Sequence, residues 1–469
     1  MEKLLISNEL GYEKFSPLND ELVTRFKAAR EIEVQGAIQR SRTAFTNWRL
    51  TTIESRGRIL RKVAQNLESH SDEIAQIVRL ETGKPIHLAL NEVSAGVEMA
   101  YLMAAQGRLS VGKQLPSATL GRQTIVSRVP RGVAALIVSF NTPIPNYAWK
   151  VFPALICGNT AILKPSQHTP LSSEYFGNLL IESGVPEDVL IVVQGDSITG
   201  ELLVKGNVDI ISFTGSSKSG KEIARATGDQ LKKTILELGG ANPFIVFADA
   251  NISKAANDAV QSAFSNAGQR CASGSRMLVH ESVYDEFIQE FKNYAGKLLV
   301  GTENECHVGT LISPSAAAEF EKFLKACQTA GARVERVGEL RGISKSTVLP
   351  AIILGLNYTH PLAQVEFFGP ATRFFSFNSE ASAIAIANST PLALTAAIWT
   401  RDSDVAYRVS DLVNSGVLNI NGPTHGSEPN MPFGGFGDSG NGTREAGIES
   451  LDYYSDLKVI STFNTRNHV

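Results

Sequence analysis

Helical spacing dominates the first hundred residues of this 469-residue chain. Between residues 20 and 110, apolar residues recur every three or four positions among many charges, most clearly at 53–67 and 74–80. This spacing places the apolar side chains on one face of a helix. The segment 20–110 is therefore predicted to be mostly helical.

Beyond residue 122 the pattern changes to that of strands. Residues 123–129 alternate apolar and polar side chains, as in a half-buried strand, and a Pro-Arg-Gly turn ends the run. Short apolar runs follow, with helical stretches between them. The predicted buried strands are 133–138, 161–163, 189–193 and 209–213. Strands that alternate with helices indicate a doubly wound parallel sheet, so the predicted fold class is α/β.

A second α/β series begins with a predicted strand at residues 242–247. A helix is expected at 253–264, and the series runs to about residue 420, before a glycine-rich segment at 432–442. Residues 453–463 alternate again like a strand. Two such series agree with the two or three domains that a chain of this length favours.

Composition and charge exclude several classes of partner. The formal net charge is −3 and no dense run of Lys or Arg occurs, which argues against nucleic acid and anionic membranes as partners. The most apolar segment, 133–140, is too short to span a bilayer, and the apolar stretch in residues 1–7 is too short for a signal peptide. The four cysteines form no CxxC pair and no disulfide framework. We expect a soluble, cytoplasmic protein without a metal.

Two residues are candidates for covalent catalysis. Cys271 ends the run Asn-Ala-Gly-Gln-Arg-Cys, where the charge of Arg270 is expected to favour the thiolate, the nucleophilic form. Glu237 lies in a glycine-containing turn at the end of a β-rich stretch. A carboxylate there is a candidate base for the water that would release an acylated thiol.

A candidate phosphate site follows the fourth predicted strand. This strand leads through Gly215 and Ser216 into a predicted helix at 217–226. Free backbone amides at a helix N-terminus suit a phosphate. The glycine spacing also approaches a P-loop, but Glu222 stands where a Mg²⁺-binding Ser or Thr is required, so nucleotide hydrolysis is rejected. An ordinary Gly-Ser turn is the alternative for this motif.

Two further polar residues follow predicted strands. Lys164 lies at the carboxyl end of the strand 161–163, where a doubly wound sheet binds ligands such as a ribose or a phosphate. A solvated loop lysine is the alternative. Asn141 follows the strand 133–138, and its amide is a candidate donor to a developing oxyanion, with a turn asparagine as the alternative.

Several short motifs occur in order along the chain. They are Phe140-Asn141-Thr142-Pro143, Trp149-Lys150, Pro153-Ala154-Leu155, Gly158-Asn159-Thr160, Lys164-Pro165-Ser166, Phe213-Thr214-Gly215-Ser216, Leu236-Glu237-Leu238-Gly239-Gly240, Gly268-Gln269-Arg270-Cys271, Glu366-Phe367-Phe368-Gly369-Pro370 and Pro432-Phe433-Gly434-Gly435. With them the chain resembles the NAD(P)-dependent aldehyde dehydrogenase superfamily from about residue 20 to 465. Several motifs in register are more specific than any single one.

The resemblance implies a reaction. Cys271 would attack an aldehyde to give a thiohemiacetal, whose oxyanion Asn141 would stabilise. Hydride transfer to the nicotinamide of NAD or NADP would leave a thioester, and Glu237 would activate the water that hydrolyses it. The partner implied is a small-molecule aldehyde.

The resemblance also assigns supporting residues. The implied cofactor-binding residues are Lys164, Ser166, Gln167, Phe213, Gly215, Ser216, Leu238, Glu366 and Phe368. The residues implied on the side of the substrate and the proton relay are Trp149, Lys150 and Glu445. For Glu445, a surface charge is the alternative.

The implied fold has three parts. A Rossmann-like cofactor-binding domain would comprise 1–111 and 131–239, and an α/β catalytic domain 240–440. A small bridging β-sheet would use 112–130 and 453–465. This sheet would mediate assembly into a homodimer or homotetramer.

Two positions bear on specificity. Gln167 stands where NAD-preferring relatives often carry a glutamate, and a neutral side chain would not repel a 2′-phosphate, so NADP stays open beside NAD. Trp149 stands where semialdehyde-specific relatives often place an arginine, which favours an uncharged or aromatic aldehyde. The polar loop 424–431 argues against a purely apolar tunnel.

Two other functions are alternatives to aldehyde oxidation. In a CoA-acylating enzyme, CoA rather than water would accept the acyl group, but CoA-dependent relatives generally lack the base at Glu237. A non-catalytic member of the fold would need none of Cys271, Glu237 and Asn141.

Overall fold

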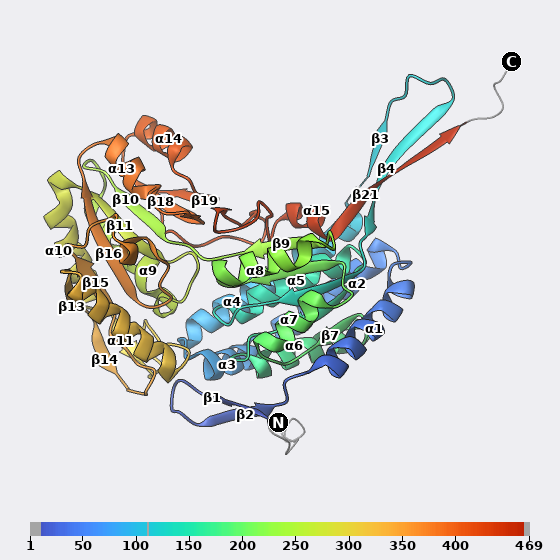
Figure 1. The fold of residues 1–469 in the computed structure, drawn as a ribbon, viewed down its shortest axis with the longest axis horizontal. Coiled ribbons are helices and arrows are strands. Elements are labelled where there is room, and N and C mark those ends of the chain that lie inside the picture. Colours follow the sequence, from blue (N-terminus) through green and yellow to red (C-terminus); the bar gives the residue numbers. More distant parts are fainter. Residues whose placement is uncertain (1–10, 110–111, 464–469) are drawn as a thin grey trace.

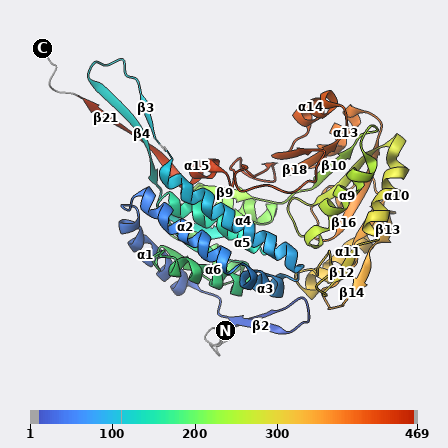
Figure 2. The same cartoon turned by 180° about the vertical axis from the view of Figure 1, so that it is seen from behind.

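The computed structural model describes residues 11–109 and 112–463. The predictions made for residues 1–7 and for the outermost parts of the predicted domains, at 1–10, 110–111 and 464–465, lie outside the described residues. Three larger sheets organise the rest, and Figures 1 and 2 show them as two lobes and a projecting arm.

The first lobe holds a five-stranded parallel sheet. In spatial order its strands are β7 (Leu190–Val192), β6 (Thr160–Lys164), β5 (Val133–Ile137), β8 (Ile210–Thr214) and β9 (Lys233–Glu237). The chain runs outward from β5 to β7 and then returns to β8, so the strand order reverses between β5 and β8. Ligands of open α/β sheets bind at the carboxyl ends of the strands beside such a reversal. The parallel architecture confirms the predicted fold class.

Helices cover both faces of this sheet. They are α1 (Glu31–Trp48), α2 (Ile53–Ser69), α3 (Ser71–Thr82), α4 (Ile86–Ala105), α5 (Pro143–Ile156), α6 (Pro170–Glu182), α7 (Ser197–Lys205) and α8 (Ser217–Gly228). Alternate residues of β5 serve the two faces: Ala134 and Leu136 pack with α2 and α4, whereas Ala135 and Ile137 pack with α1 and α7. Burial on both faces explains why the strand is a continuous apolar run.

The second lobe holds a seven-stranded sheet. In spatial order its strands are β13 (Arg333–Arg336), β15 (Ala351–Leu354), β16 (Ala371–Phe377), β11 (Gly274–His280), β10 (Asn242–Val246), β18 (Thr395–Trp399) and β19 (Val417–Ile420). All neighbours are parallel except β13, which pairs antiparallel with β15. The helices of this lobe are α9 (Ile252–Phe264), α10 (Tyr284–Ala295), α11 (Pro314–Thr329), α12 (Pro361–Gln364), α13 (Glu380–Ala387) and α14 (Ser403–Leu412). Two short strand pairs complete it, β12 (Leu299–Gly301) with β14 (Glu339–Arg341), and β17 (Leu392–Ala393) with β20 (Phe436–Gly437).

The third sheet forms the projecting arm. It joins β21 (Ser455–Phe463), β4 (Arg122–Pro130) and β3 (Lys113–Leu115), and β21 pairs with β4 along its full length. In both views these strands extend away from the first lobe (Figures 1 and 2). The small bridging sheet of the predicted fold is thus present, whereas the domain boundaries stay predictions.

Two local predictions are wrong. Residues 22–26 are not helical but form β2 (Leu22–Phe26), which pairs with β1 (Tyr12–Phe15) in a hairpin. This ribbon buries only one side chain of β1 and none of β2 completely, so it carries little periodic signal. The C-terminal strand begins at Ser455 rather than 453, because residues 451–454 form the short helix α15 (Leu451–Tyr454).

Within the two described ranges, no helix combines the length and the apolar character that a bilayer-spanning segment needs.

Candidate active site

One cavity of about 660 Å³ brings most of the predicted site residues together. It lies at the carboxyl ends of β5 and β8 and is closed by residues that flank β10 and β11 of the second lobe. The predicted residues that line it are Asn141, Trp149, Gly215, Ser216, Glu237, Leu238, Cys271, Glu366, Phe368 and Glu445. The predicted residues outside its lining are Lys150, Lys164, Ser166, Gln167 and Phe213.

Cys271 follows a strained turn between α9 and β11. Asn266 and Ala267 have φ values of 54° and 53°, a left-handed conformation that costs free energy in residues with a side chain. Gly268 continues the turn at φ 65°, and a Cβ there would lie 2.2 Å from the carbonyl oxygen of Gly369. Hydrogen bonds offset the strain: the Asn266 amide donates to the carbonyl of Asn141 at 3.0 Å and to that of Gln269 at 3.3 Å. The turn therefore fixes Cys271 relative to the end of β5.

The carbonyl of Cys271 is held from the second sheet. The side chain of Asn242, at the start of β10, donates to the carbonyl oxygens of Cys271 at 2.6 Å and Ser273 at 2.8 Å. The sequence-based assignment missed Asn242 and Asn266, because a buried asparagine that supports a turn has the same local signal as one in an exposed loop.

The charge of Arg270 favours the Cys271 thiolate, as predicted, but larger effects outweigh it. Burial, followed by the carboxyls of Glu366 and Glu237, raises the pKa of the Cys271 thiol to about 12. The Arg270 charge opposes these effects but is the weakest of the influences on this pKa. The net effect of the folded structure therefore favours the neutral thiol.

Glu237 ends β9 and is almost completely buried. Neither oxygen of its carboxyl has a hydrogen-bond partner among the described residues, and a Cβ at Gly434 would lie 2.7 Å from one of them. Burial, followed by the charge of Glu445, raises the pKa of Glu237 well above its usual value. A glycine at 434 thus leaves room for a carboxyl group whose oxygens are available for a ligand or water.

A buried ion pair lies behind Glu237. Lys150 on α5 pairs with Glu445 and donates to the hydroxyl of Ser212 at 2.9 Å, and that hydroxyl donates to Glu445 at 3.0 Å. Glu445 is 2% exposed, so the alternative of a surface charge is wrong. Ser212, which the sequence-based assignment missed, completes this polar group on β8.

Asn141 presents a hydrogen-bond donor. Its side-chain oxygen accepts from the amide of Asn146 at 3.3 Å, and its main-chain carbonyl accepts from Lys84 at 2.8 Å. No described residue accepts from the side-chain nitrogen of Asn141, and the residue lines the cavity. An amide held by its oxygen is oriented to donate to a ligand.

The turn after β8 has the features of a phosphate site. Ser216 caps α8 by accepting from the amide of Ser219 at 3.2 Å, and the Gly215 amide donates to the carbonyl of Glu237 at 3.1 Å. A Cβ at Gly215 would lie 2.4 Å from the ring of Phe213, so this ring packs beneath the turn. The turn, the helix N-terminus and the cavity coincide.

Glu366 and Phe368 form the opposite wall. The Glu366 carboxyl accepts from the amide of Gly240 at 3.1 Å, and burial raises its pKa to about 7. The Phe368 ring meets Phe140 edge-on, with 5.8 Å between the ring centroids. These contacts give the cavity a planar aromatic side and a carboxyl group between the two lobes.

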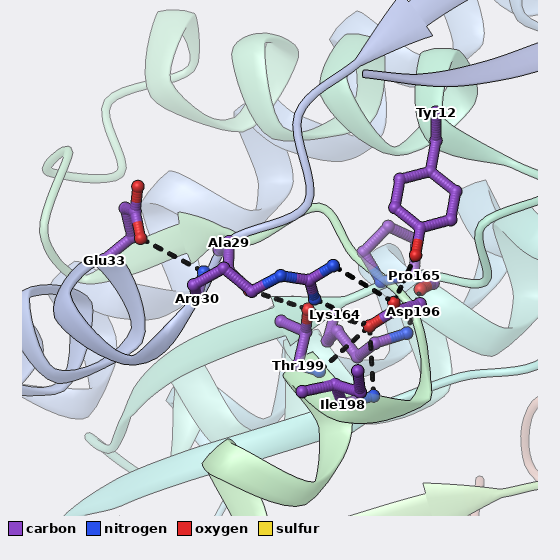
Figure 3. A network of polar contacts seen from close by, with 9 residues as sticks. All are labelled: Tyr12, Ala29, Arg30, Glu33, Lys164, Pro165, Asp196, Ile198 and Thr199. Carbon is purple, nitrogen blue, oxygen red and sulfur yellow. Dashed lines mark hydrogen bonds and ion pairs between the residues drawn. The ribbon is translucent and has the colours of Figure 1, made fainter. Parts of the chain in front are cut away.

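Figure 3 shows the residues around Lys164, at the end of β6. Lys164 donates to the carbonyl of Pro165 at 2.9 Å, and burial lowers its pKa to about 8. Nearby, Asp196 caps α7 and accepts from Arg30 at 3.0 Å and from Tyr12. Lys164 is 6% exposed, so the alternative of a solvated loop lysine is wrong.

Gln167 is not brought to the main cavity. It lines a separate hollow of about 380 Å³ beside the β1–β2 hairpin. Ser166 accepts from the amide of His168 at 3.3 Å and thereby shapes this loop. Among the described residues, no cluster of three or more His, Cys, Asp or Glu side chains suits a metal ion.

An open α/β sheet with a phosphate turn at its reversal point, beside a half-buried thiol in the same cavity, defines a dinucleotide-dependent oxidoreductase. Comparisons with known proteins give the family. Residues 6–460 match the aldehyde dehydrogenase family. The chain is 33% identical to an aldehyde dehydrogenase of Davidiella tassiana, with 98% of this chain and 94% of the relative covered. It is 34% identical to the succinate-semialdehyde dehydrogenase (NADP(+)) GabD of Escherichia coli, with 91% and 89% covered.

Solved structures similar to this chain support the same family. A betaine aldehyde dehydrogenase of Staphylococcus aureus in complex with NAD+ superposes with a TM-score of 0.93 at 28% identity, covering 99% of this chain and 93% of that one. A putative aldehyde dehydrogenase of Burkholderia cenocepacia gives 0.92 at 32% identity, covering 96% and 94%. The chain belongs to the aldehyde dehydrogenase family and oxidises an aldehyde with hydride transfer to NAD or NADP.

The raised pKa of Glu366 predicts a pH-dependent stability. A carboxyl whose folded-state pKa is raised to about 7 contributes stability that is present below its unfolded pKa and is lost as the pH rises through 7. Glu366→Gln keeps an acceptor for Gly240 but carries no charge. Without cofactor, the free energy of unfolding of the variant at pH 8 should therefore exceed that of the wild type by roughly 1–3 kcal/mol, which raises its unfolding temperature. Near pH 4.5 the two proteins should unfold at the same temperature.

Thermal unfolding at the two pH values checks this. Glu286→Gln, on an exposed position of α10, is the control and should change neither value. Equal unfolding temperatures for Glu366→Gln and wild type at pH 8 would contradict the assigned burial of this charge.

Proposed function

We propose that Cys271 is the nucleophile of the aldehyde oxidation, Asn141 the oxyanion donor and Glu237 the base that activates water. The observation that carries this proposal is their convergence: all three line one cavity, and the Glu237 carboxyl has no described partner. Each of them also comes from a different element, the end of β5, the end of β9 and the turn before β11.

The reaction divides into an oxidation and a hydrolysis. The Cys271 sulfur bonds to the carbonyl carbon, and the resulting oxyanion accepts a hydrogen bond from the amide of Asn141. When bound, the nicotinamide accepts the hydride that leaves the tetrahedral carbon. A thioester remains on Cys271. Glu237 removes a proton from water, the hydroxide adds to the thioester carbon, and the thiolate leaves with release of the carboxylate product.

The protonation states favoured at Cys271 and Glu237 are consistent with these roles. Burial disfavours the thiolate of Cys271 and the carboxylate of Glu237 alike. The thiol proton must therefore pass to a water molecule in the cavity as the sulfur attacks. Glu237 must likewise lose its own proton before it acts as the base for the hydrolytic water. We assign Lys150 and Glu445, which are joined through Ser212, as the buried group that exchanges protons with Glu237.

The cofactor fits the residues present. Gly215 and Ser216 would hold the pyrophosphate at the start of α8, beside Phe213 and Leu238. Glu366 would accept from the nicotinamide ribose, and Phe368 would pack near the ring. Lys164, Ser166 and Gln167 would lie on the adenosine side. A neutral Gln167 places no carboxylate against a 2′-phosphate, which is consistent with NADP as well as NAD.

The substrates named for the relatives do not identify the aldehyde that this chain oxidises. Relatives include succinate-semialdehyde and betaine aldehyde dehydrogenases, whose substrates carry opposite charges. Trp149 lines the cavity and packs on Phe433, with 5.6 Å between the ring centroids. CoA acylation is not favoured, because Glu237 is present to activate water. A non-catalytic role is not favoured either, because the cavity contains the complete set of reacting groups.

We further propose that the arm mediates a homodimer or homotetramer. Leu457 and Val459 on β21 expose 66% and 60% of their surface, and Phe463 on the same face exposes 58%. Apolar faces of this kind mark contact surfaces. Localisation in the cytoplasm also stays a prediction, since one relative is the mitochondrial enzyme of Leishmania tarentolae.

Replacing the sulfur tests the function. Cys271→Ala should lower the rate of NAD(P)H formation with an aldehyde panel by at least about a thousandfold, because no covalent intermediate can form. Cofactor binding, followed by protein fluorescence, should be unchanged. Cys327→Ala, which removes a buried thiol from the core of the second lobe, is the matched control and should keep most of the activity. Substantial oxidation by Cys271→Ala would refute the covalent mechanism.

Acidic substitutions on the apolar face of the arm test whether the arm mediates the oligomer. Leu457→Asp and Val459→Asp should shift the wild-type dimer or tetramer to a smaller species in light scattering coupled to size-exclusion chromatography, because a carboxylate on this face opposes burial. Thr462→Asp lies on the opposite face of β21 and should leave the mass unchanged. A monomeric wild type would overturn the proposal.

A further inference from the structure

The β1–β2 hairpin carries one buried charge. Lys14 is 3% exposed, whereas its neighbours on β1, Tyr12, Glu13 and Phe15, are exposed. Burial lowers the pKa of Lys14 to about 8, and the charge of Glu81 on α3 opposes this effect. Burying a charged side chain costs free energy, which a nearby opposite charge offsets. The position of Lys14 therefore indicates that its charge acts on Glu81.

Glu81 in turn holds the start of α6. Its two carboxyl oxygens accept from the main-chain amides of Leu171 at 2.7 Å and Ser172 at 3.1 Å. Burial raises the pKa of Glu81 to about 7, whereas the hydrogen bonds from Ser172 and Leu171 and the charge of Lys14 favour the carboxylate. An ionised carboxyl accepts at both oxygens, whereas a protonated one must donate at one of them. Lys14 thus stabilises the form of Glu81 that holds α6.

The segment held in this way is the loop between β6 and α6. It begins at Lys164, the last residue of β6, and ends at Pro170, the first residue of α6. Ser166 and Gln167 lie within it, and these residues and Lys164 are the ones assigned above to the adenosine side of the cofactor. The strand fixes one end of this loop, and Glu81 fixes the other.

Tyr12, on the same strand as Lys14, contacts the helix on the other side of Lys164 (Figure 3). The Tyr12 hydroxyl donates to the carboxyl of Asp196, which also accepts from Arg30 at 3.0 Å and caps α7. A Cβ at Gly200 in α7 would lie 3.8 Å from the Lys164 side chain, so Lys164 packs on this helix. One strand of the hairpin is therefore connected to the starts of both α6 and α7.

We propose that Tyr12 and Lys14 are positioning residues for the adenosine side of the cofactor site. Both residues line the separate hollow beside the hairpin rather than the main cavity, so they act through Asp196 and Glu81. A loop that is ordered before binding lowers the free-energy cost of binding. The inference rests on the proposed function, because it takes the cofactor site as assigned there.

Binding of NADH or NADPH in the absence of an aldehyde, measured by isothermal titration calorimetry, tests the proposal. Tyr12→Phe should raise the Kd of the preferred cofactor by about three- to tenfold, and Lys14→Met by about tenfold or more, because each change removes an interaction with a buried or capping carboxyl. Lys14→Arg, which keeps the charge, should lie between Lys14→Met and the wild type. ADP, or its 2′-phosphate where NADPH is preferred, carries the adenosine side alone and should lose affinity by the same factor.

Two further measurements separate positioning from a general loss of structure. At saturating cofactor, kcat should stay within about twofold of the wild type, because the reacting groups lie on other elements. Without cofactor, the amides of residues 166–172 should exchange hydrogen faster in Tyr12→Phe and Lys14→Met, whereas exchange in β10 and β11 should not change. Tyr407→Phe on α14 and Lys27→Met, both at exposed positions, are the matched controls and should leave the Kd unchanged.

An unchanged Kd in either Tyr12→Phe or Lys14→Met would overturn the role of that residue. A fall in kcat as large as the rise in Kd would overturn the proposal as a whole, since it would show that the reacting centre is disturbed as well. Should Lys14→Met fail to fold, Tyr12→Phe, which removes a single hydroxyl, decides. A wild type that binds neither NADH nor NADPH would instead refute the cofactor site of the proposed function.

Discussion

The main-chain carbonyl of Asn141 joins the parts of the active site. It accepts from Lys84, before α4, at 2.8 Å and from Asn266, in the turn before Cys271, at 3.0 Å. One acceptor thus links the end of β5 in the first lobe to the nucleophile's turn in the second. The left-handed residues at 266 and 267 persist because these contacts offset their strain. Without this link, the oxyanion donor and the sulfur would have no fixed relation.

Burial governs the electrostatics of the site. It raises the pKa of Cys271, Glu237 and Glu366, so the structure favours their neutral forms. Two buried ion pairs lie behind the cavity: Lys150 with Glu445 behind the base, and Lys84 with Glu92 near Arg270. A cavity of neutral reacting groups with charges behind them suits a reaction in which charge appears only in the transition states.

Periodicity predicted the fold because both faces of the first sheet are buried, which leaves β5 and β6 as continuous apolar runs. The turn at Gly215 was predictable because strand, glycine and helix are adjacent in the chain. Contacts between segments that are distant in sequence could not be predicted in this way. The hairpin β1–β2 lacks a buried face, the pKa of Cys271 depends on carboxyls more than thirty residues away in either direction, and the support from Asn266 exists only in the folded chain.

The central claim is that Cys271 carries the acyl group while Glu237 releases it. Rapid mixing of Glu237→Gln with an aldehyde and NAD(P), followed by mass spectrometry of the peptide that contains Cys271, tests it directly. The account predicts a burst of about one reduced nicotinamide per active site and an added acyl mass on Cys271, with slow turnover afterwards. No burst, or a burst that leaves Cys271 unmodified, would contradict it.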